Sequence, residues 1–176
     1  MKFPSIGRFL SVFLLSSLFS PLGGAEPVSL AYSPECILES VARKKNIALD
    51  AGIAIPSIYV ESKTPLSQFQ DAIEPQWGIR PDSFSNAFAY ARNEIYLIDD
   101  GAYYARHGRF MDDSLAHELA HFIQYAYQHA DFTVGDESLE SEAVDIQDWF
   151  RRTFMATGQS PCASRGFTRQ SQTTIK

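Results

Sequence analysis

The stretch Ser114-Leu-Ala-His-Glu-Leu-Ala-His121 sets His117, Glu118 and His121 in the spacing His-Glu-x-x-His. Residues four apart lie one turn above each other on one face of a helix, so both imidazoles can reach the same metal ion. The residue after the first histidine projects about 100° around the helix, where it can reach a water beside the metal without becoming a ligand. The pattern predicts a helix with two zinc-binding histidines and with Glu118 as general base.

The residues around the motif favour a helix over about 113–129. Asp112 and Asp113 are expected to supply N-cap oxygens and a negative charge that suits the helix dipole. Apolar residues recur after them at helical spacing, and no Gly or Pro occurs before Gly135. We therefore expect the motif to lie on one uninterrupted helix.

A catalytic zinc site uses three protein ligands and one open position, so a third ligand must lie elsewhere. The acidic stretch 136–145 is the expected source, and it opens a second helix capped by Asp136 or Ser138. One side of this helix carries an apolar stripe, formed by Leu139, Ala143, Ile146, Phe150 and Phe154. An acidic first turn also complements the helix dipole whatever the function, so these residues alone do not single out a ligand.

The two segments together resemble the gluzincin metallopeptidases, in which a Glu on the next helix completes His-Glu-x-x-His. Eighteen residues separate His121 from Glu140, similar to the spacing in the aminopeptidase branch, and Ala143 takes the small position three residues later. The resemblance implies Glu140 as the third zinc ligand. Glu142 is the alternative, because an Ala follows the ligand in thermolysin-like members, and Glu137 is a more distant one. The acidic helix also looks like that of small secreted bacterial proteins with this motif.

The resemblance implies a fold and an activity. We expect an α+β, zincin-like domain, in which a mixed sheet or hairpin packs on the metal-binding helix and a glutamate-bearing helix follows. The expected activity is zinc-dependent hydrolysis of a peptide or protein substrate by metal-activated water, with Glu118 as base. Asp145 is the nearest candidate for the carboxylate that orients a ligating histidine. Six residues are available as oxyanion donors: Tyr103, Tyr104, His107, Tyr125, Tyr127 and His129.

Two other functions stay open at this point. The same residues could hold zinc in a binding or assembly domain without proteolysis, or could hydrolyse a non-protein amide such as a cell-wall crosslink. Glu118 argues against the first, because a structural zinc site is usually closed by four protein ligands and has no use for a base. The sequence leaves the substrate, endo- or exo-cleavage and the oligomeric state open.

The first 25 residues have the layout of a secretory signal peptide. Lys2 and Arg8 form a basic region, 9–19 an apolar region, and Gly23-Gly24-Ala25 a small-residue cleavage site. We predict cleavage after Ala25 and a secreted or periplasmic protein. The apolar run is too short for a stable membrane-spanning helix, so we expect no transmembrane anchor after cleavage.

Composition and cysteine usage indicate the class of protein. Of 176 residues, 45% are hydrophobic and 13% aromatic, which is typical of a globular domain, here expected over 26–158 and followed by a polar tail over 159–176. A net charge of −6 without a basic run excludes a nucleic-acid partner. In an oxidising compartment Cys36 and Cys162 are expected to form a disulfide, with two buried free thiols as the alternative.

The chain ahead of the motif has a mixed α/β pattern. It predicts a helix over 34–45, a strand over 55–61, a helix over 66–73 that ends before Pro75, and strands over 84–91 and 94–99 joined by a short turn. The gluzincin resemblance would place the strand 94–99 along the rim of the substrate cleft. An exposed strand edge there could pair with an extended peptide.

Overall fold

Three short strands form the sheet at the centre of this α+β fold. They are β1 (Ser57–Val60), β2 (Ala87–Ala89) and β3 (Glu94–Leu97). Their order is β1-β3-β2, with β1 parallel and β2 antiparallel to β3, so the sheet is mixed as expected. The computed structural model describes residues 26–162, and the predicted signal peptide and residues 163–176 lie outside this range.

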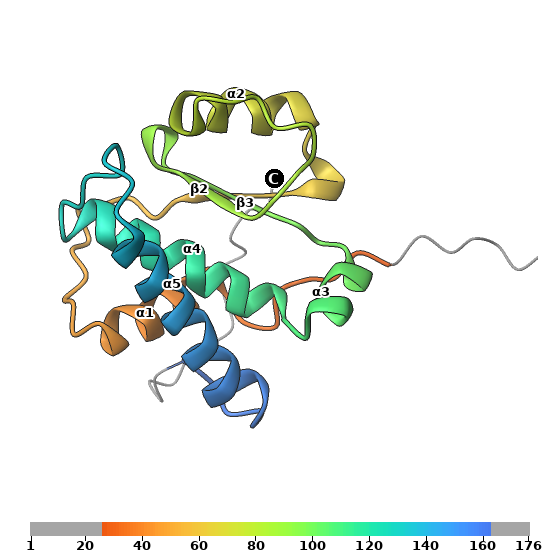
Figure 1. Cartoon of the computed structure of the whole chain (residues 1–176). Helices are drawn as coiled ribbons and strands as arrows, with labels where there is room; N and C mark the ends of the chain where they lie inside the picture. The colour runs from red at the N-terminus through yellow and green to blue at the C-terminus, as the bar shows by residue number, and fades with distance from the viewer. Residues whose placement is uncertain (1–25, 163–176) are drawn as a thin grey trace, which may run out of the picture.

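Helices cover both faces of this sheet (Figure 1). Within the described residues the α-helices are α1 (Pro34–Lys44), α2 (Leu66–Trp77), α3 (Gly101–His107), α4 (Met111–Ala126) and α5 (Glu137–Phe150). Short turns of 3-10 helix, η1 (Glu61–Lys63) and η2 (Tyr90–Arg92), follow β1 and β2, and a π-helical segment, η3 (Arg151–Met155), extends α5. None of the helices described is long and apolar enough to cross a membrane.

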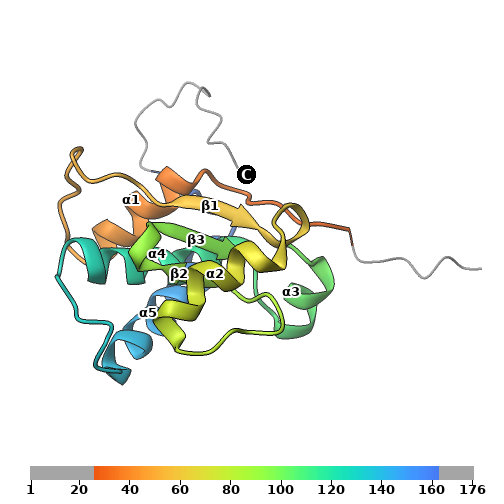
Figure 2. The same cartoon turned by 90° about the horizontal axis from the view of Figure 1, so that it is seen from above.

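Alternation along the strands divides the apolar interior into two clusters. Phe88, Ile95 and Leu97 point to the face that packs with α1, α4 and α5 in the main core. Their neighbour Tyr96 points to the opposite face, where it packs on Phe69 of α2. Figure 1 shows α2 on one side of the sheet and α4 on the other, and Figure 2 shows the same layers from above.

The start of α4 differs from the expected cap. The helix begins at Met111, and the Asp113 carboxylate accepts a hydrogen bond from the backbone N–H of Phe110 at 3.1 Å. Asp112 does not cap α4, because its carboxylate accepts from the backbone N–H groups of Ala31 at 3.0 Å and Tyr32 at 2.9 Å. Asp112 therefore attaches the N-terminal segment to α4, a long-range contact that local capping rules do not consider.

The prediction that the helix 66–73 ends before Pro75 was wrong, because α2 continues through this proline to Trp77. A proline inside a helix leaves the carbonyl four residues earlier without its usual donor. Here that carbonyl belongs to Asp71, and it accepts a hydrogen bond from Nη2 of Arg92 at 2.7 Å. The helix then ends at Gly78, which adopts a left-handed φ of 68°.

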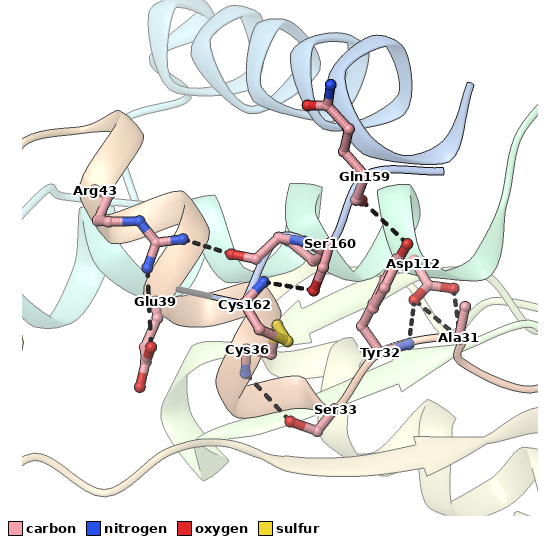
Figure 3. The surroundings of a disulfide bond; sticks show 11 residues. Ala31, Tyr32, Ser33, Cys36, Glu39, Arg43, Asp112, Gln159, Ser160 and Cys162 are labelled. Carbon is pink, nitrogen blue, oxygen red and sulfur yellow. Dashed lines mark hydrogen bonds and ion pairs between the residues drawn. A yellow bond between two sulfur atoms is a disulfide. The ribbon is translucent and has the colours of Figure 1, made fainter. Parts of the chain in front are cut away.

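Cys36 and Cys162 form the predicted disulfide, which joins α1 to the end of the described chain (Figure 3). Next to it, the Arg43 guanidinium donates to the carbonyl oxygen of Pro161. The first residues of the predicted polar tail therefore lie against α1 and not away from the domain. Figure 3 also shows Asp112 pointing at the segment that leads into α1.

Loss of the disulfide should destabilise the protein without changing its fold. The bond closes a loop with a sequence separation of 126 residues, for which the chain-entropy model gives about 4 to 5 kcal/mol. We expect the double variant Cys36→Ser/Cys162→Ser to unfold at lower denaturant concentration by up to this free energy, and reductant to have the same effect on the wild type. Equal stability of the oxidised and reduced wild type would contradict the prediction.

Asp113 should make stability depend on pH. Burial raises the pKa of Asp113 from its ordinary 3.8 to about 6, although the bond from Gln147 opposes the shift. Between these values the folded state holds a proton that the unfolded state has released, so stability falls as pH rises through this window, by at most about 3 kcal/mol. An asparagine at this position does not titrate, so Asp113→Asn should lack this pH-dependent contribution to the free energy of unfolding. We therefore expect its melting temperature, relative to wild type, to increase from pH 4 to pH 7, and a difference independent of pH would contradict the shift.

Candidate metal centre

Two helices bring three potential metal ligands together. His117 and His121 lie one turn apart on α4, and their Nε2 atoms are 3.1 Å from each other. Glu140, on the first turn of α5, places one carboxylate oxygen 3.2 Å from Nε2 of His121 and the other 3.5 Å from Nε2 of His117. The rings are 14% and 13% exposed and the carboxylate 62%. This group could bind a metal ion.

The position of Glu140 follows from how α5 begins and packs. Asp136 caps the helix by accepting from the N–H of Ser138 at 2.9 Å, as one of the two predicted caps. Ala143, Ile146 and Phe150 are buried in the core that includes α4. Glu140 lies one turn before Ala143, so the same helix face that packs on α4 continues toward its histidines.

The alternative ligands lie elsewhere. The Glu142 carboxylate accepts from Nε2 of Gln124 at 2.8 Å and forms an ion pair with Lys45, whose side chain is buried. Glu137 is exposed at the first position of α5. Among the three glutamates considered from the sequence, Glu140 is the one that the structure brings to both histidines.

Sequence reasoning missed the residue that contacts the far side of His121. Asp145, the nearest candidate from the sequence, is exposed on α5. Instead, Nδ1 of His121 lies 2.8 Å from Oε1 of Gln124. The available signal was the spacing, because a residue three positions after a histidine lies on the same helix face. Nδ1 of His117 is buried with no hydrogen-bond partner in the part of the chain that the structure describes.

Glu118 lies next to the potential ligands. Its side chain faces the same cleft as the histidines but is only 5% exposed. Burial raises the pKa of Glu118, while the neighbouring His117 and His121 oppose this rise. The backbone of Phe88 on β2 lies beside the carboxylate and also opposes this rise in its pKa. Glu118 is thus a buried carboxylate beside the potential ligands and close to Phe88 of the sheet.

The charges of the three potential ligands influence one another. Hydrogen bonds from His117 and His121 hold the pKa of Glu140 far below its usual range. Burial lowers the pKa of His121, but the bond to Glu140 and the charge of Glu118 raise it by more, so the net shift is upward. A proton between these side chains would therefore compete with a metal ion for the same site.

A cleft of about 340 Å³ opens beside the three potential ligands. Besides the potential ligands and Glu118, its walls come from α2, from β2 with the residue before it, and from the loop before α5: Gln76, Trp77, Asn86, Ala87, Phe88 and Phe132. None of the six oxyanion donors considered from the sequence lines this cleft. The wall residues that carry side-chain N–H donors, Gln76, Trp77 and Asn86, belong to segments that the motif does not point to.

The strand that borders the cleft is β2, so the expectation for the strand 94–99 was wrong. β3 pairs with β1 on one side and β2 on the other, so it has no open edge. The outer edge of β2 is also occupied. The Gln76 amide donates to the carbonyl of Phe88 at 3.1 Å and accepts from the N–H of Tyr90 at 3.3 Å. Main-chain pairing with a peptide at this edge would have to displace Gln76.

The chain matches no family model, no curated protein and no solved structure. Fold and site together define an α+β domain with a two-helix His-His-Glu group that faces an open cleft.

The structure predicts different metal affinities for variants of the two neighbouring glutamates. Glu140→Ala removes a carboxylate that faces both histidines, so it should lose stoichiometric zinc measured by mass spectrometry of metals. Glu142→Gln should retain the zinc, because the Glu142 carboxylate faces Gln124 and Lys45. Loss of zinc from Glu142→Gln together with its retention in Glu140→Ala would move the third ligand to Glu142.

Proposed function

We propose that this protein is an exported zinc-dependent peptidase of the gluzincin type. The observation that carries the proposal is the convergence of His117, His121 and Glu140 on one side of an open cleft that also contains the buried Glu118. The motif predicts two ligands and a base from the sequence, and the arrangement of α4 and α5 brings Glu140 to the histidines as a potential third ligand. That the fold is zincin-like and that the chain is a gluzincin are parts of the same proposal.

The spacing of the donor atoms supports zinc as the metal. Ligands about 2.0–2.1 Å from a tetrahedral zinc lie about 3.3 Å from one another. The three separations here are 3.1, 3.2 and 3.5 Å. Two imidazoles with one carboxylate are also a common donor set of catalytic zinc, and the cleft leaves room for a fourth, non-protein ligand. The residues present therefore fit the metal.

The proposed chemistry assigns separate roles to the site residues. When bound, zinc would supply Lewis-acid chemistry, which acidifies water and polarises a carbonyl group. Glu118 would accept the proton of the attacking water and then donate it to the leaving amine. Its burial and its raised pKa favour this second, acidic role.

Two features of the site favour hydrolysis over a zinc-holding domain without activity. A structural zinc is normally closed by four protein ligands, whereas three side chains converge here and a cleft opens beside them. Burying the Glu118 carboxylate also costs free energy, and a purely structural zinc site has no need of it. Hydrolysis of a non-protein amide, such as a cell-wall crosslink, would use the same residues and is the second candidate, which a substrate panel would distinguish.

Export is the remaining part of the proposal. The disulfide between Cys36 and Cys162 is compatible with an oxidising, extracytoplasmic compartment. It agrees with the signal peptide predicted over 1–25, which lies outside the described residues. The expected partners are a peptide or protein substrate and no nucleic acid.

Removing the base should separate catalysis from metal binding. We expect Glu118→Gln to keep the fold and one zinc but to lose about two to four orders of magnitude in turnover of a labelled unfolded protein, because the amide cannot accept the proton. His117→Ala and His121→Ala should lose the zinc itself. Glu137→Gln, on the exposed start of α5, is the matched control and should remain active. Full activity of zinc-loaded Glu118→Gln would overturn the mechanism.

A further inference from the structure

Gln124 is a completely buried amide behind the proposed ligand His121. Its Nε2 donates to two acceptors on α5, the carbonyl oxygen of Leu139 at 2.9 Å and the Glu142 carboxylate at 2.8 Å. An amide nitrogen has two N–H groups, so both of its donors are used. The remaining atom, Oε1, lies 2.8 Å from Nδ1 of His121.

These contacts determine which way the amide points. With the amide reversed, Oε1 would face the Leu139 carbonyl and the Glu142 carboxylate, so three oxygens without a proton would oppose each other in the interior. Nε2 must therefore face α5, and Oε1 must face the imidazole. Because an amide oxygen only accepts, Nδ1 of His121 must carry the hydrogen of this bond. In the neutral ring that leaves the lone pair on Nε2, on the side of His117 and Glu140.

A buried lysine holds the far end of this chain of contacts. Lys45 follows the last residue of α1, and its ammonium group forms an ion pair with the Glu142 carboxylate. The Glu142 carboxylate thus lies between the Lys45 ammonium group and the Gln124 amide, and it accepts from both. Three helices thus contribute to one series of contacts: Lys45 pairs with Glu142, Glu142 accepts from Gln124, and Gln124 contacts His121. His117 has no such contact, because its Nδ1 has no partner among the described residues.

We propose that Gln124 is a positioning residue for the metal centre, which fixes the ring orientation and the Nδ1–H tautomer of His121 so that Nε2 is presented to the cation. The inference rests on the proposed zinc site. It uses an amide, oriented from α5, where an orienting carboxylate was expected at Asp145. Partners of this kind typically change metal affinity by ten- to a hundredfold when they are removed.

The test is a zinc titration of the wild type and of Gln124→Met, which has a similar size but no hydrogen bonds, against a competing chelator. We expect Gln124→Met to raise the dissociation constant for Zn²⁺ by about ten- to a hundredfold. Gln147→Met is the matched control, because Gln147 is also buried but bonds Asp113 and Ser114 away from the ligands. The control should bind zinc within about threefold of the wild type. Equal affinity of Gln124→Met and wild type would overturn the proposal.

A second measurement does not depend on folding of the variant. In the zinc-loaded wild type, labelled with ¹⁵N in histidine, Nδ1 of His121 should show a directly bonded proton and Nε2 should be the coordinated nitrogen. A His121 that lacks the Nδ1 proton, or that binds zinc through Nδ1, would overturn the proposal. A wild type that binds no zinc would overturn both this inference and the proposed function. A wild type that binds zinc in this tautomer but hydrolyses no peptide would overturn the peptidase proposal alone.

Discussion

The packing of α5 on α4 is the contact on which the site depends. The motif supplies two histidines that any regular helix would place one turn apart, but the third donor exists only because α5 is fixed against them. Ala143 is fully buried at this contact, one turn after Glu140. A larger side chain at position 143 would push the helices apart, since cores tolerate added volume poorly. The small residue that the gluzincin resemblance singled out thus has a direct structural reason here.

The sequence predicted the parts of this site that depend on local rules. Helical spacing places His117 and His121, and an Asx cap correctly starts α5 at Asp136. Glu140 came from a resemblance and not from the residues alone, because several acidic residues share its helix. Gln124 was missed, because its spacing from His121 shows only that the two residues share a helix face. The orientation of its amide depends on Leu139 and Glu142, which are 15 and 18 residues away in sequence.

The incorrect predictions of the fold also arise from contacts between residues far apart in the sequence. Pro75 normally ends a helix, but Arg92 satisfies the carbonyl that it leaves without a donor. Asp112 is of a residue type that commonly caps helices, yet its carboxylate accepts from the backbone N–H of Ala31, 81 residues away. The strand order could not be obtained from alternation either, because the pattern shows which residues face the core and not which edge remains open. In each case a long-range hydrogen bond or strand pairing overrides a correct local preference.

The site contains two carboxylates whose environments differ in the way that their proposed roles require. Glu140 is largely exposed and bonded to both histidines, so its charged form is favoured, as a metal ligand needs. Glu118 is buried beside it, and burial shifts its pKa upward, as a group that must both take and return a proton needs. Exchanging the two environments would give a ligand that competes poorly for a cation and a base that is too weak. The division of roles therefore follows from the fold: α5 leaves one glutamate at the surface, and β2 covers the other.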